Sequence, residues 1–177
     1  MIIDVHGHTT APQELYGYNY RLIANRGDFG RGDPRIGDEA IEKTLARHLG
    51  MLKEYGIDLQ LIPPRPWGIP NAETSEKIVQ WMAGAVNDLI ARQVAMYPSH
   101  FRGMAGLPQV AGVGPGNCTE ELDRCVTELG FVGCMINPDP GEGDQQTPGM
   151  GDEFWYPLYE KMVALDVPGL VHTGGCR

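Results

Sequence analysis

Short apolar runs alternate with longer segments of helical period along this chain, and that alternation limits the folds open to it. The runs are Met1–Val5, Leu59–Ile62, Arg102–Leu107, Phe131–Ile136 and Gly169–His172. Strands separated by helices form βαβ units, whose strands pair in parallel. The sequence therefore predicts an α/β fold built on a parallel sheet.

Four segments have the apolar spacing of amphipathic helices. They run from Glu39 to Tyr55, from about Ala72 to Tyr97, from Thr119 to Leu129 and from about Glu153 to Leu165. We expect Asp38 to cap the first helix, and Gly56 and Gly130 to follow the ends of the first and third.

Five strands and four helices in strict alternation are more than half of a TIM (β/α)8 barrel, which typically has about 250 residues. The chain has 177 residues and ends directly after the fifth predicted strand. We therefore interpret residues 1–177 as one incomplete domain, the N-terminal part of such a barrel with about five β/α units. The alternative is a compact doubly wound sheet of five strands, which this length also fits.

Two stretches lack a sustained apolar period, namely Tyr16–Gly37 and Asn137–Gly151. Both follow predicted strands, and the loops after barrel strands form the rim where sites are built. We expect an insertion at the rim at about residues 16–37, with lid or substrate loops as the functional interpretation and solvated connections as the alternative.

The chain is acidic, because 14 Lys and Arg stand against 23 Asp and Glu, which gives a net charge of −9. Nucleic acids and anionic membranes are bound by clustered Lys and Arg, so neither is expected as a partner. No apolar run approaches the roughly 18–20 residues that span a bilayer, and the first residues do not have the basic and apolar pattern of a signal peptide, so neither feature is expected. Four cysteines without a C-x-x-C pair indicate reduced thiols, so we expect a cytoplasmic protein.

The strongest chemical signal is the sequence Asp4-Val5-His6-Gly7-His8 at the end of the first predicted strand. Strand residues two apart point to the same side, so His6 and His8 can converge on one metal ion. Imidazole suits Zn²⁺ or another divalent transition metal. The alternative is a pair of partly exposed histidines at a strand end.

His172 ends the fifth predicted strand, and parallel strands bring their C-terminal ends to one face. We therefore expect His172 to join His6 and His8 as a third metal ligand, the alternative being a core histidine satisfied by hydrogen bonds. His48, in the first helix, and His100, before the third strand, are expected to be structural or solvated.

Two further residues at strand ends are candidates for binding a small anionic carboxylate substrate. Arg65 follows the second strand among prolines, and a guanidinium held there suits a carboxylate. Asn137 follows the fourth strand and can hold a substrate oxygen. The alternatives are an Arg paired with the protein's own acids and an Asn that forms an Asx-turn before proline.

The start Met1–Pro12, the Pro64-Arg65 loop, the Ile136–Pro140 stretch and the strand ending in His172 together resemble the amidohydrolase superfamily. More narrowly, they are similar to its decarboxylase and hydratase branch, and within it to the 4-oxalomesaconate hydratases of the protocatechuate 4,5-cleavage pathway. The resemblance implies one Zn²⁺ bound by His6, His8, His172 and an acidic group from a later strand. That ligand and the catalytic carboxylate are expected beyond this sequence, so no catalytic residue is assigned within it.

The resemblance implies metal-assisted addition of water to a carbon–carbon double bond conjugated with a keto acid. A metal-dependent decarboxylase of an aromatic or unsaturated acid is the first alternative, and an inactive N-terminal fragment is the second. A homodimer is compatible with all three. G-x-S-x-G and P-loop motifs are absent from the sequence, which argues against serine hydrolases and P-loop nucleotide-binding proteins.

Overall fold

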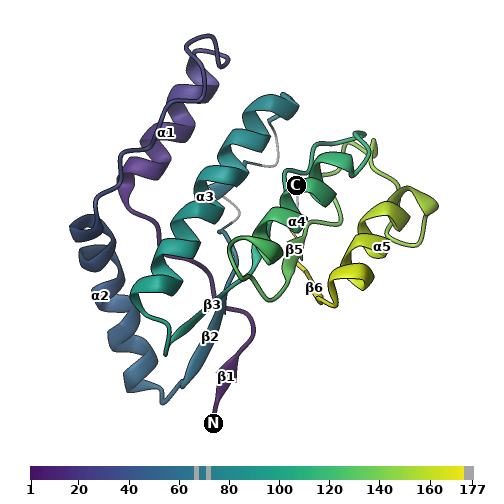
Figure 1. Ribbon diagram of the computed structural model, residues 1–177. Helices are drawn as coiled ribbons and strands as arrows, with labels where there is room; N and C mark the ends of the chain where they lie inside the picture. Colours follow the sequence, from purple (N-terminus) through teal and green to yellow (C-terminus); the bar gives the residue numbers. More distant parts are fainter. Residues whose placement is uncertain (66–67, 71–72, 174–177) are drawn as a thin grey trace.

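The computed structural model describes residues 1–65, 68–70 and 73–173. Within that part, every strand pairing is parallel, with the order β1-β2-β3 in one sheet and β4-β5-β6 in the other (Figure 1). The strands are β1 Ile3–Asp4, β2 Leu59–Ile62, β3 Phe101–Gly103, β4 Ala105–Gly106, β5 Cys134–Ile136 and β6 Gly169–Val171.

The predicted strand Arg102–Leu107 is divided into β3 and β4 at Met104. The Met104 amide donates to the Ile62 carbonyl at 3.4 Å, whereas the next amide, of Ala105, donates to the Gly133 carbonyl at 2.8 Å. The Gly103 carbonyl also accepts the Val132 amide, at 3.0 Å, so the residues on either side of Met104 bond the segment before β5 while Met104 itself bonds β2. β3 and β4 thus continue one another through Met104 and join the two sheets side by side.

Strand order distinguishes the two folds left open by the sequence. Within each sheet every strand pairs with its neighbour in sequence, and no order reversal occurs among the described strands. A doubly wound sheet needs such a reversal, whereas a (β/α)8 barrel is wound in one direction. The topology therefore favours the barrel-type winding.

The helices lie beside the strands that they connect (Figure 1). They are α1 Gln13–Ala24, α2 Asp38–Glu54, α3 Glu76–Met96, α4 Gly116–Thr127 and α5 Tyr156–Leu165, the last preceded by the 3-10 turn η2 Glu153–Trp155. The four predicted helices are confirmed with shifted ends. Gly56 and Gly130 have φ of 65° and 69° and follow α2 and α4, as expected of helix-terminating glycines. The predicted start of α3 at Ala72 lies outside the described residues.

Helix α1 corrects the expectation of irregular structure from Tyr16 onward. Leu15, Tyr18, Asn19 and Leu22 are buried on one face of this helix. Their spacing is helical, but a tyrosine and an asparagine occupy two of the four core positions, so an apolar count missed the pattern. Residues 25–37 contain neither helix nor strand, in agreement with the prediction.

Asp38 is not the N-cap of α2, which corrects a second expectation. The cap is Gly37, and no side chain accepts a capping hydrogen bond there. The Asp38 carboxylate instead binds Arg92 of α3 at 2.5 Å. It is the first helical residue, where a negative charge still suits the helix dipole.

Side chains on one face of the sheets pack against the helices and form the core. Ile62, Phe101, Cys134 and Ile136 are buried there. Ile3 lies on the other face and is 49% exposed. The helices therefore cover one face of the sheets.

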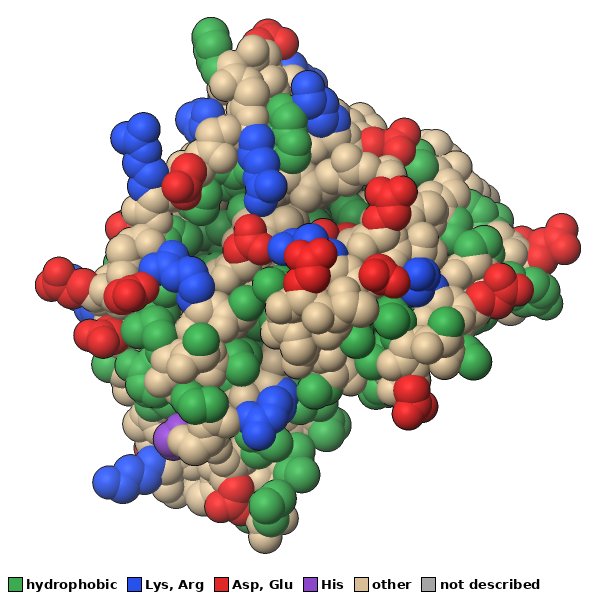
Figure 2. All heavy atoms as spheres, viewed as in Figure 1, with side chains coloured by type: hydrophobic (Ala, Val, Ile, Leu, Met, Phe, Trp, Pro, Cys, Tyr) green, Lys and Arg blue, Asp and Glu red, His purple; other side chains and the backbone are tan. Residues whose placement is uncertain are grey.

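The described surface has mixed charge. On the face shown in Figure 2, Lys and Arg side chains are interspersed with Asp and Glu. Cys118, Cys125 and Cys134 are buried free thiols, and Cys176 lies outside the described residues. None of the described helices combines the length and apolarity needed to cross a membrane.

Candidate metal centre

His6 and His8 lie in the segment directly after β1, which bends at Val5 and His6, rather than on the strand itself as expected. The strand ends because the Asp4 carboxylate accepts the His6 amide at 3.0 Å, and the Thr9 amide then donates to the Pro63 carbonyl at 2.9 Å. Gly7 between the histidines packs on Gln60, where a Cβ atom would lie 2.2 Å from the Gln60 Cδ. Only glycine lets the segment pass this close to β2.

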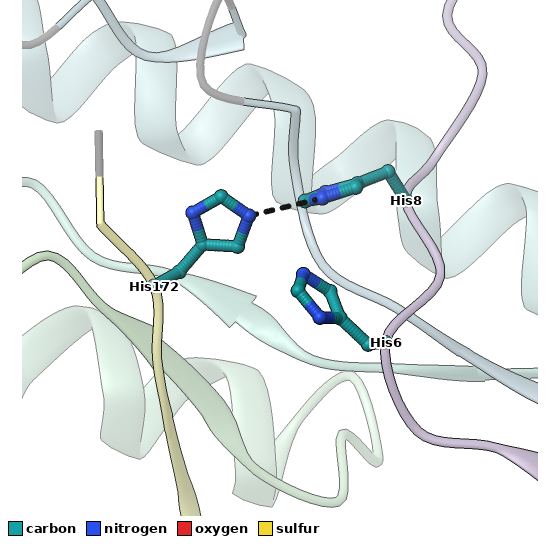
Figure 3. A group of neighbouring side chains, drawn as sticks. All are labelled: His6, His8 and His172. Atoms are coloured by element: carbon teal, nitrogen blue, oxygen red, sulfur yellow. Dashed lines mark hydrogen bonds between the residues drawn. The ribbon is translucent and has the colours of Figure 1, made fainter. Parts of the chain in front are cut away.

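His172 follows β6, and the structure brings it next to the early pair (Figure 3). The ring centroids are 5.4 Å apart for His6 and His8, and 5.0 Å from each of these rings to His172. One ligand nitrogen from each ring lies within 4.8 Å of the other two. The histidines from the two ends of the chain therefore form one cluster.

Backbone carbonyls determine which nitrogen of two rings carries a proton. His8 Nδ1 lies 3.0 Å from the Pro64 carbonyl, and His172 Nδ1 lies 2.9 Å from the Thr173 carbonyl. A carbonyl only accepts, so both Nδ1 atoms donate and both Nε2 atoms of the neutral rings carry lone pairs. This is the usual arrangement of a histidine that binds metal through Nε2.

The two Nε2 atoms face each other at 3.2 Å (dashed in Figure 3). A hydrogen bond between them would need a second proton on one ring. Two nitrogens bound tetrahedrally to one ion at about 2.05 Å lie about 3.3 Å apart. The spacing and the lone pairs of these two residues therefore fit a shared cation.

Burial lowers the pKa of His8 and outweighs the opposing effect of the Pro64 carbonyl. The neighbouring His172, His6 and Arg65 lower this pKa further, because each disfavours a positive charge on the ring. Neutral imidazole is the form that binds metal. His8 is thus kept in the ligand form at neutral pH.

Arg65 lies at the surface beside this segment, and its Nε donates to the Thr9 carbonyl at 3.3 Å. No carboxylate of the described residues lies within ion-pair distance of its guanidinium. The structure thus gives no support to an Arg65 paired with the protein's own acids.

Asn137 follows β5 and has features of both expected roles, an Asx-turn residue and a substrate-binding residue. Its Oδ1 accepts the Asp139 amide at 2.9 Å, which is the Asx-turn, while its Nδ2 is buried with no partner in the described part of the chain. Gln109 holds the backbone in place, since its amide group bonds the Asn137 N–H and C=O at 2.8 Å each. Sequence reasoning missed Gln109, because a glutamine after β4 carries no motif.

No Asp or Glu among the described residues joins the three imidazoles in this cluster. His100 lies outside it and bonds Ser99, whereas His48 is half-buried and bonds Thr10 and Gln60 close to the cluster. Sequence reasoning treated both as structural or solvated, and no sequence signal distinguished them.

A model of the amidohydrolase family matches residues 3–176. The chain belongs to the amidohydrolase family. It is 41% identical, over 99% of its length, to 2-keto-4-carboxy-3-hexenedioate hydratase from Sphingobium sp. strain SYK-6, of which it covers 52%. This amidohydrolase also resembles the solved 4-oxalomesaconate hydratase from Rhodopseudomonas palustris, with TM-score 0.88 and 37% identity over 98% of this chain and 52% of that one.

A dihydroxybenzoic acid decarboxylase from Polaromonas sp. JS666, solved with bound manganese and the inhibitor 2-nitroresorcinol, is a third relative. Its TM-score is 0.70 at 25% identity, over 99% of this chain and 50% of that one. The chain thus spans about half the length of each of these relatives. Its α/β fold matches amidohydrolase barrel structures and is consistent with an N-terminal part of a TIM barrel.

Proposed function

We propose that this chain supplies the metal-binding part of a hydratase that adds water to the carbon–carbon double bond of 4-oxalomesaconate. The single observation that carries the proposal is the cluster of His6, His8 and His172 in a chain 41% identical to a hydratase of this type. The corresponding pathway is protocatechuate 4,5-cleavage.

His6, His8 and His172 would hold one divalent ion. Three nitrogen ligands with open positions suit a catalytic Zn²⁺, and Zn²⁺ or another divalent transition metal is the proposed cofactor. Manganese in the Polaromonas relative supports a divalent ion without deciding its identity. When bound, such an ion supplies Lewis acidity that polarises a substrate oxygen or lowers the pKa of water.

Arg65 and Asn137 are the proposed substrate-binding residues. The substrate would carry three carboxylates, and the Arg65 guanidinium, which pairs with no described carboxylate, suits one of them. The unpartnered Asn137 Nδ2 would donate to a second substrate oxygen. Addition of water places hydroxyl on one alkene carbon and hydrogen on the other, which gives a hydroxylated oxo-tricarboxylate. The carboxylate that moves the proton is expected beyond this sequence.

The test is metal analysis and an absorbance assay on the purified protein, including any residues that follow Arg177. We expect bound metal, loss of the conjugated absorbance of 4-oxalomesaconate, and loss of that activity in chelator. Arg65→Met and Asn137→Leu are expected to raise KM for the substrate. A metal-free protein that still hydrates the substrate would refute the proposal.

Decarboxylation is the second candidate, favoured by the structural similarity to the Polaromonas decarboxylase. Release of CO₂ from a panel of aromatic and unsaturated acids separates it from hydration. The third candidate is a fragment without activity of its own, since the chain spans about half of its relatives. A cooperative melt of residues 1–177 that shifts upward with zinc would count against it.

A further inference from the structure

Hydrogen bonds connect the two ends of the metal-binding segment through side chains from other elements. At one end, Asp4 Oδ2 accepts from Gln60 Nε2 of β2 at 2.6 Å. Gln60 Oε1 lies 2.6 Å from His48 Nε2 of α2. At the other end, His48 Nδ1 lies 3.1 Å from Thr10 Oγ1. We call Asp4, Gln60, His48 and Thr10 the bracket, because they enclose the segment that carries His6 and His8.

The chemistry of the four side chains determines which group donates and which accepts in each hydrogen bond of the bracket. An ionised carboxylate only accepts, so Gln60 must turn its NH₂ group toward Asp4 and its carbonyl toward His48. The His48 ring must therefore carry its proton on Nε2. The other ring nitrogen then accepts from the Thr10 hydroxyl. All four groups are satisfied in one orientation.

Packing leaves the bracket little freedom to rearrange. Gln60 is 6% exposed, and the backbone of Gly7 lies against its side chain, where no Cβ would fit. The half-buried His48 ring packs on Phe101, with centroids 5.4 Å apart. Burial lowers the pKa of His48, which keeps the ring neutral, as the bracket requires. The remaining Asp4 oxygen accepts the amide of His6 itself.

We propose that His48 and Gln60 are positioning residues that hold the segment from Asp4 to Thr10 in its ligand geometry before an ion binds. This inference rests on the proposed metal site. It adds that His48 and Gln60, which do not contact the ion, influence the metal affinity. They do so by fixing the backbone of the segment and not by contacting the rings of His6 and His8. The bracket requires a neutral His48 ring that carries one proton, on Nε2.

The test measures Co²⁺ affinity of the full chain by visible absorption. Gln60→Met keeps the approximate shape of the side chain and removes its hydrogen bonds. His48→Phe keeps an aromatic ring and removes the two ring nitrogens that take part in the bracket. Outer-shell partners of metal ligands change metal affinity by about 10–100-fold, so we expect a rise of that size in the Co²⁺ Kd of each variant. Because the bracket acts as a unit, the variant that carries both substitutions should have a Co²⁺ Kd only slightly higher than that of either single variant.

Leu45→Ala is the matched control, since it removes a buried side chain of α2, the helix that carries His48. It should lower Tm and leave the Co²⁺ Kd unchanged. A second readout is ¹⁵N NMR of the imidazoles in metal-free protein. We expect His48 as the Nε2–H tautomer in the wild type and a mixture of tautomers in Gln60→Met.

The outcomes separate this inference from the proposed function. If the wild-type protein binds no Co²⁺, both the proposed metal site and this inference are refuted. A wild type that binds Co²⁺ while Gln60→Met binds equally well overturns the inference alone. So does an Nδ1–H tautomer of His48 in the wild type, or a Kd in Leu45→Ala that rises as much as in Gln60→Met.

Discussion

The three imidazoles of the cluster come from opposite ends of the chain and have different surroundings. His6 is exposed, whereas His8 and His172 are half-buried, and each of these two has Nδ1 bonded to a backbone carbonyl. Those carbonyls orient the Nε2 lone pairs of His8 and His172 toward a common point. The two rings therefore need to move little when an ion binds. The affinity of the cluster should therefore depend on each ring.

His172→Ala removes one of three ligands and should weaken divalent metal binding by more than the roughly 100-fold that outer-shell changes reach. Equilibrium dialysis with Zn²⁺ measures this. His100→Ala, a histidine outside the cluster, should bind as tightly as the wild type. Equal affinities of the two variants would contradict the three-histidine site.

The lowered pKa of His48 makes stability depend on pH. The unfolded chain, with an ordinary histidine pKa near 6.5, takes up a proton at a higher pH than the folded chain does. The free energy of unfolding should therefore fall as pH drops from about 7 through 6.5 and below. Urea titrations in chelator at several pH values measure it, and His48→Gln should reduce the slope. An unchanged slope would show that His48 does not contribute.

Among single residues, His6, His8 and His172 could be found from the sequence because each stands at the end of an expected strand. Parallel strands end on one face, so strand ends alone predict that such residues meet. His48 and Gln60 could not be found this way. Their contacts with Thr10 and Asp4 join residues that are 38 and 56 positions apart, and no local pattern records such contacts.

At the level of elements, α1 is part of the core and is not a mobile loop. It packs on α3, and Asn19 Nδ2 donates to the Gly68 carbonyl at 3.0 Å, which connects the helix to the loop that contains Arg65. The four strongly periodic helices could be predicted, whereas α1 could not, since polar residues fill half of its buried face. The predicted strand Arg102–Leu107 corresponds to β3 and β4, which are connected through Met104.

Leu22→Ala should lower the free energy of unfolding by about 2–5 kcal/mol, because it removes a fully buried side chain of α1. Tyr20→Ala, in the same helix but 72% exposed, should change it by less than about 0.5 kcal/mol. Urea denaturation of both variants gives the comparison. Similar values would mean that α1 is loosely attached.

For the molecule as a whole, the outer strands are the main weakness of the described part. There, β1 pairs only with β2, and β6 only with β5. Val171, on β6, is 51% exposed. Unpaired strand edges with exposed apolar residues promote association between chains.

Residues 1–177 should therefore self-associate as concentration rises, and Val171→Lys should reduce this, because a lysine at a strand edge opposes pairing. Sedimentation velocity measures the association. Val163→Lys, an equally polar change at an 80% exposed position on α5, should leave it as in the wild type. A wild type that sediments as a monomer at every concentration would contradict this expectation.

The division of the strands into two sheets has a mechanical consequence for the metal site. His6 and His8 follow a strand of the first sheet, whereas His172 follows a strand of the second, and the two sheets are joined at Met104 and by α3, which packs on both β3 and β4. An ion held by all three rings would therefore act as a cross-link between two halves of the molecule. Its binding free energy would add to the cohesion of the halves, so chelation would loosen their docking as well as empty the site.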